Sequence, residues 1–333
     1  MAVEPVTTND ALDRAAEALA GATSVALACH VNPDADALGS MLGLSAFLRA
    51  RGVQTVCSFG NDPFERPAWV ASLPGSEALV EPRRFPKEPK VFVTLDCASL
   101  DRLGQLVPVA SRAPTVIWID HHVSNEGLGT IPVIDPTASS TAEIVFRLMK
   151  HMGGEVPTEA AACLYAGIVT DTGRFQYEST SPETLRLAAE LRTHPFDHAK
   201  LAEALFADAS LGSLRVMAIA LQRLELDEEA GLVWTYLTQA DLQAAAVGVG
   251  ETDELIDVVR TAREADVAAV LKQQRDGRFK VSARSRGGAD LAKVAARFGG
   301  GGHRLAAGYT SKVGLEETAR DLAQALREAR VSS

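Results

Sequence analysis

The chain has 333 residues, of which 47% are hydrophobic and 23% are charged, so it is long enough for two globular domains with sizeable cores. Its formal net charge of −10 argues against the broad basic surface that binding long duplex nucleic acid requires. A short anionic substrate can still bind where metal ions or local arginines supply positive charge.

The four cysteines indicate a reducing compartment. They lie in or beside apolar segments without forming a CxxC pair, which predicts buried thiols rather than a zinc site or disulfides: Cys29, Cys57, Cys97 and Cys163. The first eleven residues lack a basic start followed by an apolar run, and no uncharged apolar stretch reaches about 18 residues. We therefore expect a cytoplasmic protein that does not bind a membrane, and the sequence leaves the formation of a homodimer open.

The first half of the chain alternates short apolar runs with helical patterns. Strands are expected at 24–29, 53–59, 91–95 and 115–119, and helices at 36–51, 140–152 and 158–169. Fully apolar strands between helices favour a parallel sheet that is covered on both faces. This predicts a Rossmann-like α/β domain over residues 1–194, with Trp118 in its core.

The second half repeats an α/β pattern on a smaller scale. Residues 195–228 are helical in pattern and carry no candidate chemistry, so we expect a helical linker, followed by a second domain over 229–333. Its strands are expected at 231–238, 267–273, 279–284 and 307–311, and its helices at 251–262, 289–298 and 315–330. Asp276-Gly277 predicts a hairpin, and the charged run 225–229 predicts a solvated loop.

Acidic residues and histidines follow the predicted elements of the first half. His30, Asp34 and Asp36 follow the first strand, Asp96 follows the third, Asp120, His121 and His122 follow the fourth, and Asp171 follows the helix ending near residue 169. Ligands bind outside the carboxyl ends of the strands in an open parallel sheet, so these residues should converge. Each alone could be a helix N-cap or a surface residue. Their joint occurrence after apolar runs favours one common site.

This set of side chains predicts a metal site. Carboxylates packed together repel one another, and burial raises their pKa values, unless cations compensate. Asp and His together suit Mn²⁺ or a similar borderline ion such as Co²⁺, whereas Mg²⁺ favours oxygen ligands. One carboxylate can bridge two metals about 3.5–4 Å apart, which is the arrangement of two-metal phosphoesterases.

Two motif sets resemble a known family. The pattern His30-x-x-x-Asp34-x-Asp36-x-x-Gly39, with Asp96, Asp120-His121-His122 and Asp171, resembles the DHH phosphoesterase superfamily. The run 299–303 followed by Ala306-Ala307-Gly308 resembles the GGGGH signature of the DHH-associated C-terminal domain. Together the halves are most similar to bifunctional oligoribonucleases and phosphatases of 3′-phosphoadenosine 5′-phosphate (PAP), and cyclic-dinucleotide phosphodiesterases share this layout.

The resemblance implies roles for these residues. One metal would be held by His30, Asp34 and Asp96, and the other by Asp36, Asp96, His121 and Asp171, so that Asp96 bridges the two. His122 would face the substrate phosphate, and Asp120 would orient the histidines.

Further residues are candidates for contact with the substrate. The glycine run offers bare backbone amides to an anion. The candidates are Gly300, Gly301, Gly302, His303, Arg284, Arg174 and Asn125. For Arg284 and Arg174 a solvated surface charge remains an alternative, and for Asn125 a turn residue.

The resemblance implies a two-metal hydrolase whose nucleophile is a metal-activated hydroxide. Its substrates would be short oligoribonucleotides (nanoRNA), dinucleotides or PAP, with cyclic dinucleotides as a further candidate, and the second domain would bind the rest of the substrate across an interdomain cleft. Two alternatives are a manganese-dependent inorganic pyrophosphatase and a nucleotide sensor without turnover. The glycine-rich run weighs against the first, and the full ligand set weighs against the second.

Overall fold

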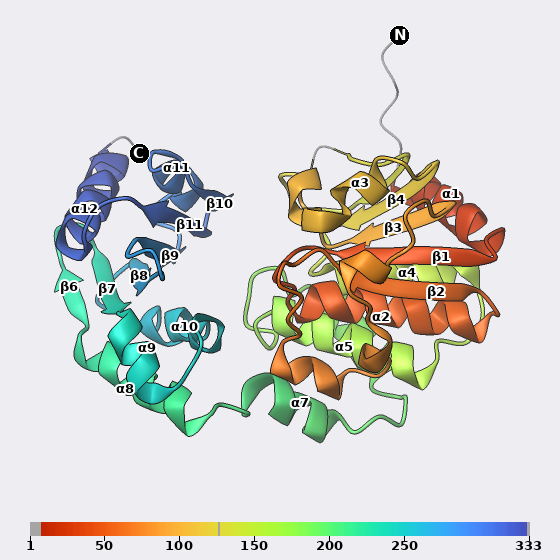
Figure 1. The fold of residues 1–333 in the computed structure, drawn as a ribbon, viewed down its shortest axis with the longest axis horizontal. Helices are drawn as coiled ribbons and strands as arrows, with labels where there is room; N and C mark the ends of the chain where they lie inside the picture. Colours follow the sequence, from red (N-terminus) through yellow and green to blue (C-terminus); the bar gives the residue numbers. More distant parts are fainter. Residues whose placement is uncertain (1–7, 126, 332–333) are drawn as a thin grey trace, which may run out of the picture. The chain divides into compact units, whose positions relative to one another are not determined.

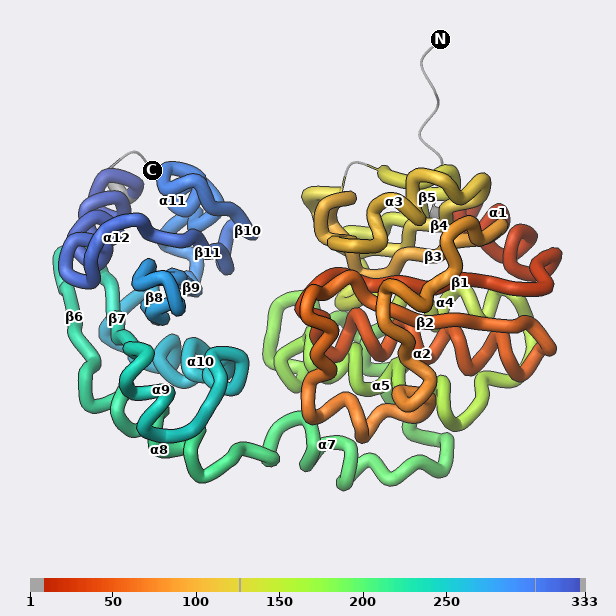
Figure 2. The backbone as a smooth tube through the Cα atoms, in the orientation of Figure 1, coloured from red at the N-terminus to blue at the C-terminus, as the bar shows by residue number. Residues whose placement is uncertain are grey.

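The protein is described by a computed structural model that covers residues 8–125 and 127–331. The chain divides into two compact units, one ending at Asp208 and one beginning at Ala209, and each has its own sheet (Figure 1, Figure 2). The boundary falls within the segment 195–228. There α7 (His198–Phe206) packs against the first unit, whereas α8 (Leu211–Gln222) packs against the second.

The first unit is built on a five-stranded sheet in which all neighbouring strands are parallel, which confirms the predicted α/β class. The strands are β1 (Ser24–Cys29), β2 (Gln54–Phe59), β3 (Val91–Leu95), β4 (Thr115–Asp120) and β5 (Ile131–Ile134). Their order is β2-β1-β3-β4-β5, so strands are added on one side of β1 and then on the other. The carboxyl ends of β1 and β3 therefore form the switch point where open α/β sheets bind ligands.

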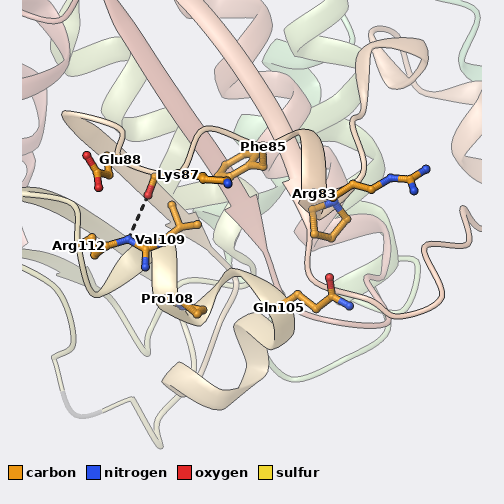
Figure 3. A pocket seen from close by; sticks show the side chains of 9 residues that line it. Arg83, Phe85, Lys87, Glu88, Gln105, Pro108, Val109 and Arg112 are labelled. Carbon is orange, nitrogen blue, oxygen red and sulfur yellow. Dashed lines mark hydrogen bonds between the residues drawn. The ribbon is translucent and has the colours of Figure 1, made fainter.

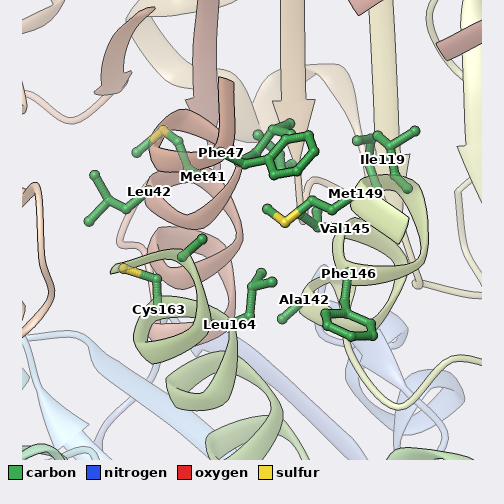
Figure 4. Packing of buried hydrophobic residues seen from close by; sticks show 14 of the residues in the cluster. Met41, Leu42, Phe47, Ile119, Ala142, Val145, Phe146, Met149, Cys163 and Leu164 are labelled. Atoms are coloured by element: carbon green, nitrogen blue, oxygen red, sulfur yellow. The ribbon is translucent and has the colours of Figure 1, made fainter. Parts of the chain in front are cut away.

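Helices cover one face of this sheet, and a largely irregular segment covers the other. The helices are α1 (Thr8–Ala20), α2 (Ala35–Ala50), α4 (Thr141–Met152), α5 (Thr158–Asp171) and α6 (Pro182–Leu191). Met41, Val145 and Leu164 from α2, α4 and α5 belong to one buried cluster (Figure 4). The opposite face packs against the short helix α3 (Val107–Ala110) (Figure 1) and against the irregular segments around it. Trp118 is buried on this face, as predicted.

The second unit has a six-stranded sheet in the order β10-β11-β9-β8-β7-β6. Its strands are β6 (Glu225–Asp227), β7 (Leu232–Leu237), β8 (Val267–Gln273), β9 (Phe279–Ser285), β10 (Gly301–His303) and β11 (Ala306–Ser311). Only β7 and β8 pair in parallel, and β8 and β9 form the predicted hairpin. One face packs on α8, α9 (Gln239–Ala245) and α10 (Leu255–Val259), and the other on α11 (Leu291–Ala296) and α12 (Leu315–Val331).

Two predicted elements differ in this unit. The helix expected over 251–262 is broken into a 3₁₀ turn (Val249–Thr252) and α10, because its buried apolar residues, Leu255, Ile256 and Val259, span little more than one turn. The loop expected at 225–229 begins with β6, a charged strand at the sheet edge, where charged side chains reach water. Within the described residues, no single helix is long and apolar enough to span a membrane, although the bent pair α7 and α8 together passes by length and composition alone.

The helices α2 and α5 approach each other closely at Gly39. A Cβ atom built there would lie 2.4 Å from the Cys163 carbonyl oxygen, which belongs to the backbone of α5 and has no room to move. Only glycine allows this approach, which places the beginning of α2 beside the end of α5.

We expect Gly39→Ala to destabilise the first unit by about 1–3 kcal/mol, because the added methyl group must push α2 away from α5. Hydrogen exchange should rise in both helices, and the melting temperature should fall. Gly21→Ala is the matched control, since a Cβ atom there would make only an ordinary contact of 3.6 Å with the Glu17 carbonyl oxygen. Equal melting temperatures for both variants would contradict this view of the helix contact.

Candidate metal centre

The candidate ligands converge at the switch point of the first sheet. His30 follows β1, Asp96 follows β3, and His121 follows β4, while Asp36 lies in the first turn of α2 and Asp171 ends α5. Asp34 is the N-cap of α2, because its Oδ1 accepts a hydrogen bond from the Ala37 N–H. A helix N-cap was the alternative to a metal ligand for this residue. Its second oxygen, Oδ2, lies 3.6 Å from His30 Nε2, so the cap and the site use different atoms of one carboxylate.

Three overlapping groups of side chains are arranged so that a metal ion could bind each. They are His30 with Asp34 and Asp96, Asp96 with His121 and His122, and Asp36 with His121 and Asp171. Asp96 is shared: its Oδ2 lies 3.4 Å from His30 Nε2, and its Oδ1 lies 3.7 Å from His121 Nε2. The two oxygens of one carboxylate therefore face two different ligand groups.

The backbone holds Asp96 in this position. The residue adopts the left-handed conformation with φ of 56°, which aspartate tolerates better than most residues, and its N–H donates to the Ile119 carbonyl at 3.0 Å. Strain of this kind costs on the order of 1–3 kcal/mol and clusters at functional sites. The turn after β3 thus directs a nearly fully buried carboxylate, 3% exposed, into the cluster.

The electrostatics of the cluster call for cations. Burial raises the pKa of Asp36 and of Asp171 well above the usual range, and the nearby Asp96 carboxylate raises both further. Burial alone would lower the pKa of His30, but its contacts with Asp34 and Asp96 raise it to about 10. Protons therefore compensate the carboxylates, and divalent cations with Asp and His ligands fit the same position.

His30 and His121 present Nε2 to the carboxylates. His30 Nδ1 lies 2.8 Å from the Val31 carbonyl oxygen, and His121 Nδ1 lies 3.4 Å from the Ala138 carbonyl oxygen. An Nδ1–H donated to a backbone carbonyl leaves Nε2 unprotonated for a cation, as is usual for metal-binding histidines.

Asp120 is the hub of a second network. It is fully buried, and its Oδ1 accepts hydrogen bonds from His122 Nδ1 at 2.7 Å and from the His121 N–H at 3.0 Å. Burial opposes the protonation of His122, but this hydrogen bond and the charge of Asp96 raise the pKa of His122 to about 9. Asn125 donates to Asp120 Oδ2 at 2.7 Å and to the Cys97 carbonyl at 3.1 Å, so its amide shapes the loop after His122.

The beginning of α4, a helix predicted from residue 140, contacts two candidate ligands, and this contact was not predicted. The Thr141 N–H donates to Asp36 Oδ2 at 2.7 Å, and the Ala142 N–H donates to Asp36 Oδ1 at 2.9 Å. The Thr141 hydroxyl donates to Asp96 Oδ1 at 3.0 Å. A helix N-terminus stabilises anions, so the Ser-Ser-Thr sequence at residues 139–141, where the predicted helix begins, was a signal for this contact.

Arg174 lies three residues after the candidate ligand Asp171, but its side chain contacts α7. Arg174 and Phe175 both adopt left-handed conformations, with φ of 61° and 64°, directly after the end of α5. The guanidinium carbon of Arg174 lies 5.1 Å from the centre of the Phe206 ring.

The remaining predicted substrate residues lie in the second unit. Arg284 is half-buried in β9, and its Nη1 donates to the Ala283 carbonyl at 3.1 Å. At Gly300 and Gly302 an added Cβ would lie 2.2 Å and 2.5 Å from backbone oxygens of β11, so close strand packing requires both glycines; Gly301 has open space. The backbone of His303 pairs with Ala306, and its side chain lies outside the described part of the structure.

An open groove of about 500 Å³ lies elsewhere on the first unit (Figure 3). Phe85 and Val109 line it, with Arg83, Lys87 and Arg112 around them. None of its lining residues is a candidate ligand, so the groove is not part of the metal centre.

Comparisons with known proteins agree with this geometry. The model of the DHH family N-terminal domain matches residues 24–168, and that of the DHHA1 domain matches residues 236–330. The bifunctional oligoribonuclease and PAP phosphatase NrnA of Thermus thermophilus is 35% identical over 91% of this chain and 89% of that protein. The cyclic-di-AMP phosphodiesterase GdpP of Geobacillus thermodenitrificans is 27% identical over 94% of this chain and 48% of that protein.

The fold agrees as well. The crystal structure of an exopolyphosphatase-related protein from Bacteroides fragilis superposes with a TM-score of 0.91 at 26% identity, covering 99% of both chains. Family models, relatives and fold therefore agree on the family that the sequence resembles. The chain belongs to the DHH family of metal-dependent phosphoesterases, and its second unit carries a DHHA1 domain.

Proposed function

We propose that this enzyme hydrolyses phosphate esters of short oligoribonucleotides and of PAP, with two Mn²⁺ ions in its active site. The observation that carries the proposal is the position of Asp96, whose two carboxylate oxygens face two ligand groups. The similarity to NrnA over nearly the whole chain supports the choice of substrates.

We assign one ion to His30, Asp34 and Asp96, and the other to Asp36, Asp96, His121 and Asp171. When bound by these residues, two divalent cations would lower the pKa of a water molecule and hold the phosphoryl oxygens for in-line attack. The two imidazoles among the ligands favour Mn²⁺ over Mg²⁺. Four free, buried cysteines support a reducing compartment, and we place the enzyme in the cytoplasm.

His122 would act on the phosphate. Asp120 accepts a hydrogen bond from His122 Nδ1, and this bond favours the protonated imidazole. A protonated imidazole in this position would stabilise negative charge on the phosphoryl oxygens and would supply a proton to the departing oxygen.

Recognition of the nucleotide would fall to the second unit. Arg284 lies on β9, which is separated from β10 by the single strand β11. Its guanidinium and the backbone amides of the segment from Gly300 to His303 form a set suited to a terminal phosphate. Arg174 and Asn125 are assigned to the catalytic unit, with Asn125 supporting the loop that carries His122.

A cyclic dinucleotide is the second candidate substrate, since the similarity to GdpP extends over 94% of this chain. A test of turnover on a ribodinucleotide, PAP, a cyclic dinucleotide and pyrophosphate distinguishes the candidates. We expect Mn²⁺-dependent release of mononucleotides from the dinucleotide and of phosphate from PAP, and loss of both after dialysis against EDTA.

Each result of this test has a distinct meaning. Undiminished turnover after exhaustive EDTA dialysis would exclude the two-metal site. Pyrophosphate as the preferred substrate would indicate an inorganic pyrophosphatase, and tight nucleotide binding without turnover would indicate a sensor.

Two substitutions should separate chemistry from recognition. His122→Ala should lower kcat roughly 100-fold or more on every substrate, because its contact is strongest in the transition state. Arg284→Gln should raise KM for nucleotides about tenfold or more, through loss of a charge-assisted hydrogen bond. It should leave a small generic phosphodiester, bis(p-nitrophenyl) phosphate, almost unaffected.

Arg278→Gln is the control for Arg284→Gln, because Arg278 precedes the same strand but is exposed and paired with Asp276. If Arg284→Gln slows the generic phosphodiester as strongly as it slows nucleotides, then Arg284 does not serve recognition.

A further inference from the structure

One residue contacts a carboxylate in each ligand group. Thr141, the first residue of α4, is fully buried and donates its N–H to Asp36 Oδ2 and its hydroxyl to Asp96 Oδ1. The oxygen that receives the hydroxyl is the one facing His121, while Asp96 Oδ2 faces His30. The Thr141 hydroxyl therefore holds Oδ1, the Asp96 oxygen that faces His121, and makes no hydrogen bond to Oδ2.

A carboxylate can bind metals in two ways, and its rotation decides between them. With one oxygen toward each ligand group, Asp96 bridges two ions; rotated about its Cβ–Cγ bond, it can offer both oxygens to one ion. A threonine hydroxyl has a single proton. When it is donated to Oδ1, it occupies one lone pair of that oxygen and leaves the other lone pair for a cation. The hydroxyl thus resists rotation of the carboxylate.

The first turn of α4 is held rigidly enough for this task. The Ser140 hydroxyl caps the helix by accepting a hydrogen bond from the Glu143 N–H, and Glu143 is itself buried. Its carboxylate accepts hydrogen bonds from the Ser139 hydroxyl at 2.6 Å and the Thr184 hydroxyl at 3.0 Å, and pairs with Arg147. The position of Thr141 is therefore fixed by a buried network that does not include the metal ligands.

We infer that Thr141 is a positioning residue that holds Asp96 in the bridging orientation and so couples the two metal ions. This inference rests on the proposed function, because it assumes two ions at Asp96. It is specific to the hydroxyl group, since the N–H contact with Asp36 persists whatever side chain stands at position 141.

The test compares Thr141→Val and Thr141→Ala, which remove the hydroxyl, with Thr141→Ser, which retains it. Thr94→Val is the matched control: Thr94 is fully buried two residues before Asp96, and among the described residues its hydroxyl makes no hydrogen bond to a candidate metal ligand. Mn²⁺ binding is measured by titration calorimetry, and coupling between two Mn²⁺ ions by electron paramagnetic resonance.

Wild type, Thr141→Ser and Thr94→Val should bind two Mn²⁺ ions and give an exchange-coupled spectrum. Thr141→Val and Thr141→Ala should lose the coupling and bind the second ion about 10–100-fold more weakly, the range typical for lost contacts to metal ligands. Circular dichroism checks that each variant is folded, and the alanine variant serves if the valine variant is not.

Two outcomes would overturn the inference in different ways. A coupled spectrum and unchanged second-site affinity in a folded hydroxyl-free variant would show that Thr141 does not set the bridge. Failure of the wild type to bind two coupled ions would instead refute the two-metal site, and with it the proposed function.

Discussion

The main constraint on the candidate metal centre is that its buried carboxylates repel one another, so that protons or cations must compensate their charge. Asp36 and Asp96 are almost completely buried, at 1% and 3% exposure, and both lie near Asp171. In the absence of cations, protons must occupy this region, which is why the pKa values of Asp36, Asp171 and His30 are raised. Divalent cations would relieve the repulsion without protons, and such cations are also what metal-dependent phosphate hydrolysis needs.

The fold is arranged to maintain this concentration of charge. The switch point between β1 and β3 brings His30 and Asp96 to adjacent strand ends, and the close contact at Gly39 brings the beginning of α2 to the end of α5. The N-terminus of α4 supplies two backbone donors to Asp36. Much of the structural precision in the first unit therefore serves a cluster that is electrostatically unfavourable by itself.

Much of the fold and the ligand set could be predicted because the signals are local. Apolar runs at 24–29 and 91–95 are strands in the structure, and acidic residues directly after such runs must lie at the carboxyl edge of a parallel sheet. The strand β5 (Ile131–Ile134) was missed because four residues with a proline give too short a pattern, and α1 and α6 were also not predicted. The contact between Thr141 and Asp96 joins residues that are 45 positions apart in the sequence, so no local sequence pattern predicts it.

Anomalous diffraction from crystals grown with Mn²⁺ can show whether two metal ions share Asp96. We expect two anomalous peaks about 3.5–4 Å apart, one within bonding distance of each Asp96 carboxylate oxygen. A single peak, or two peaks of which only one contacts Asp96, would contradict this expectation.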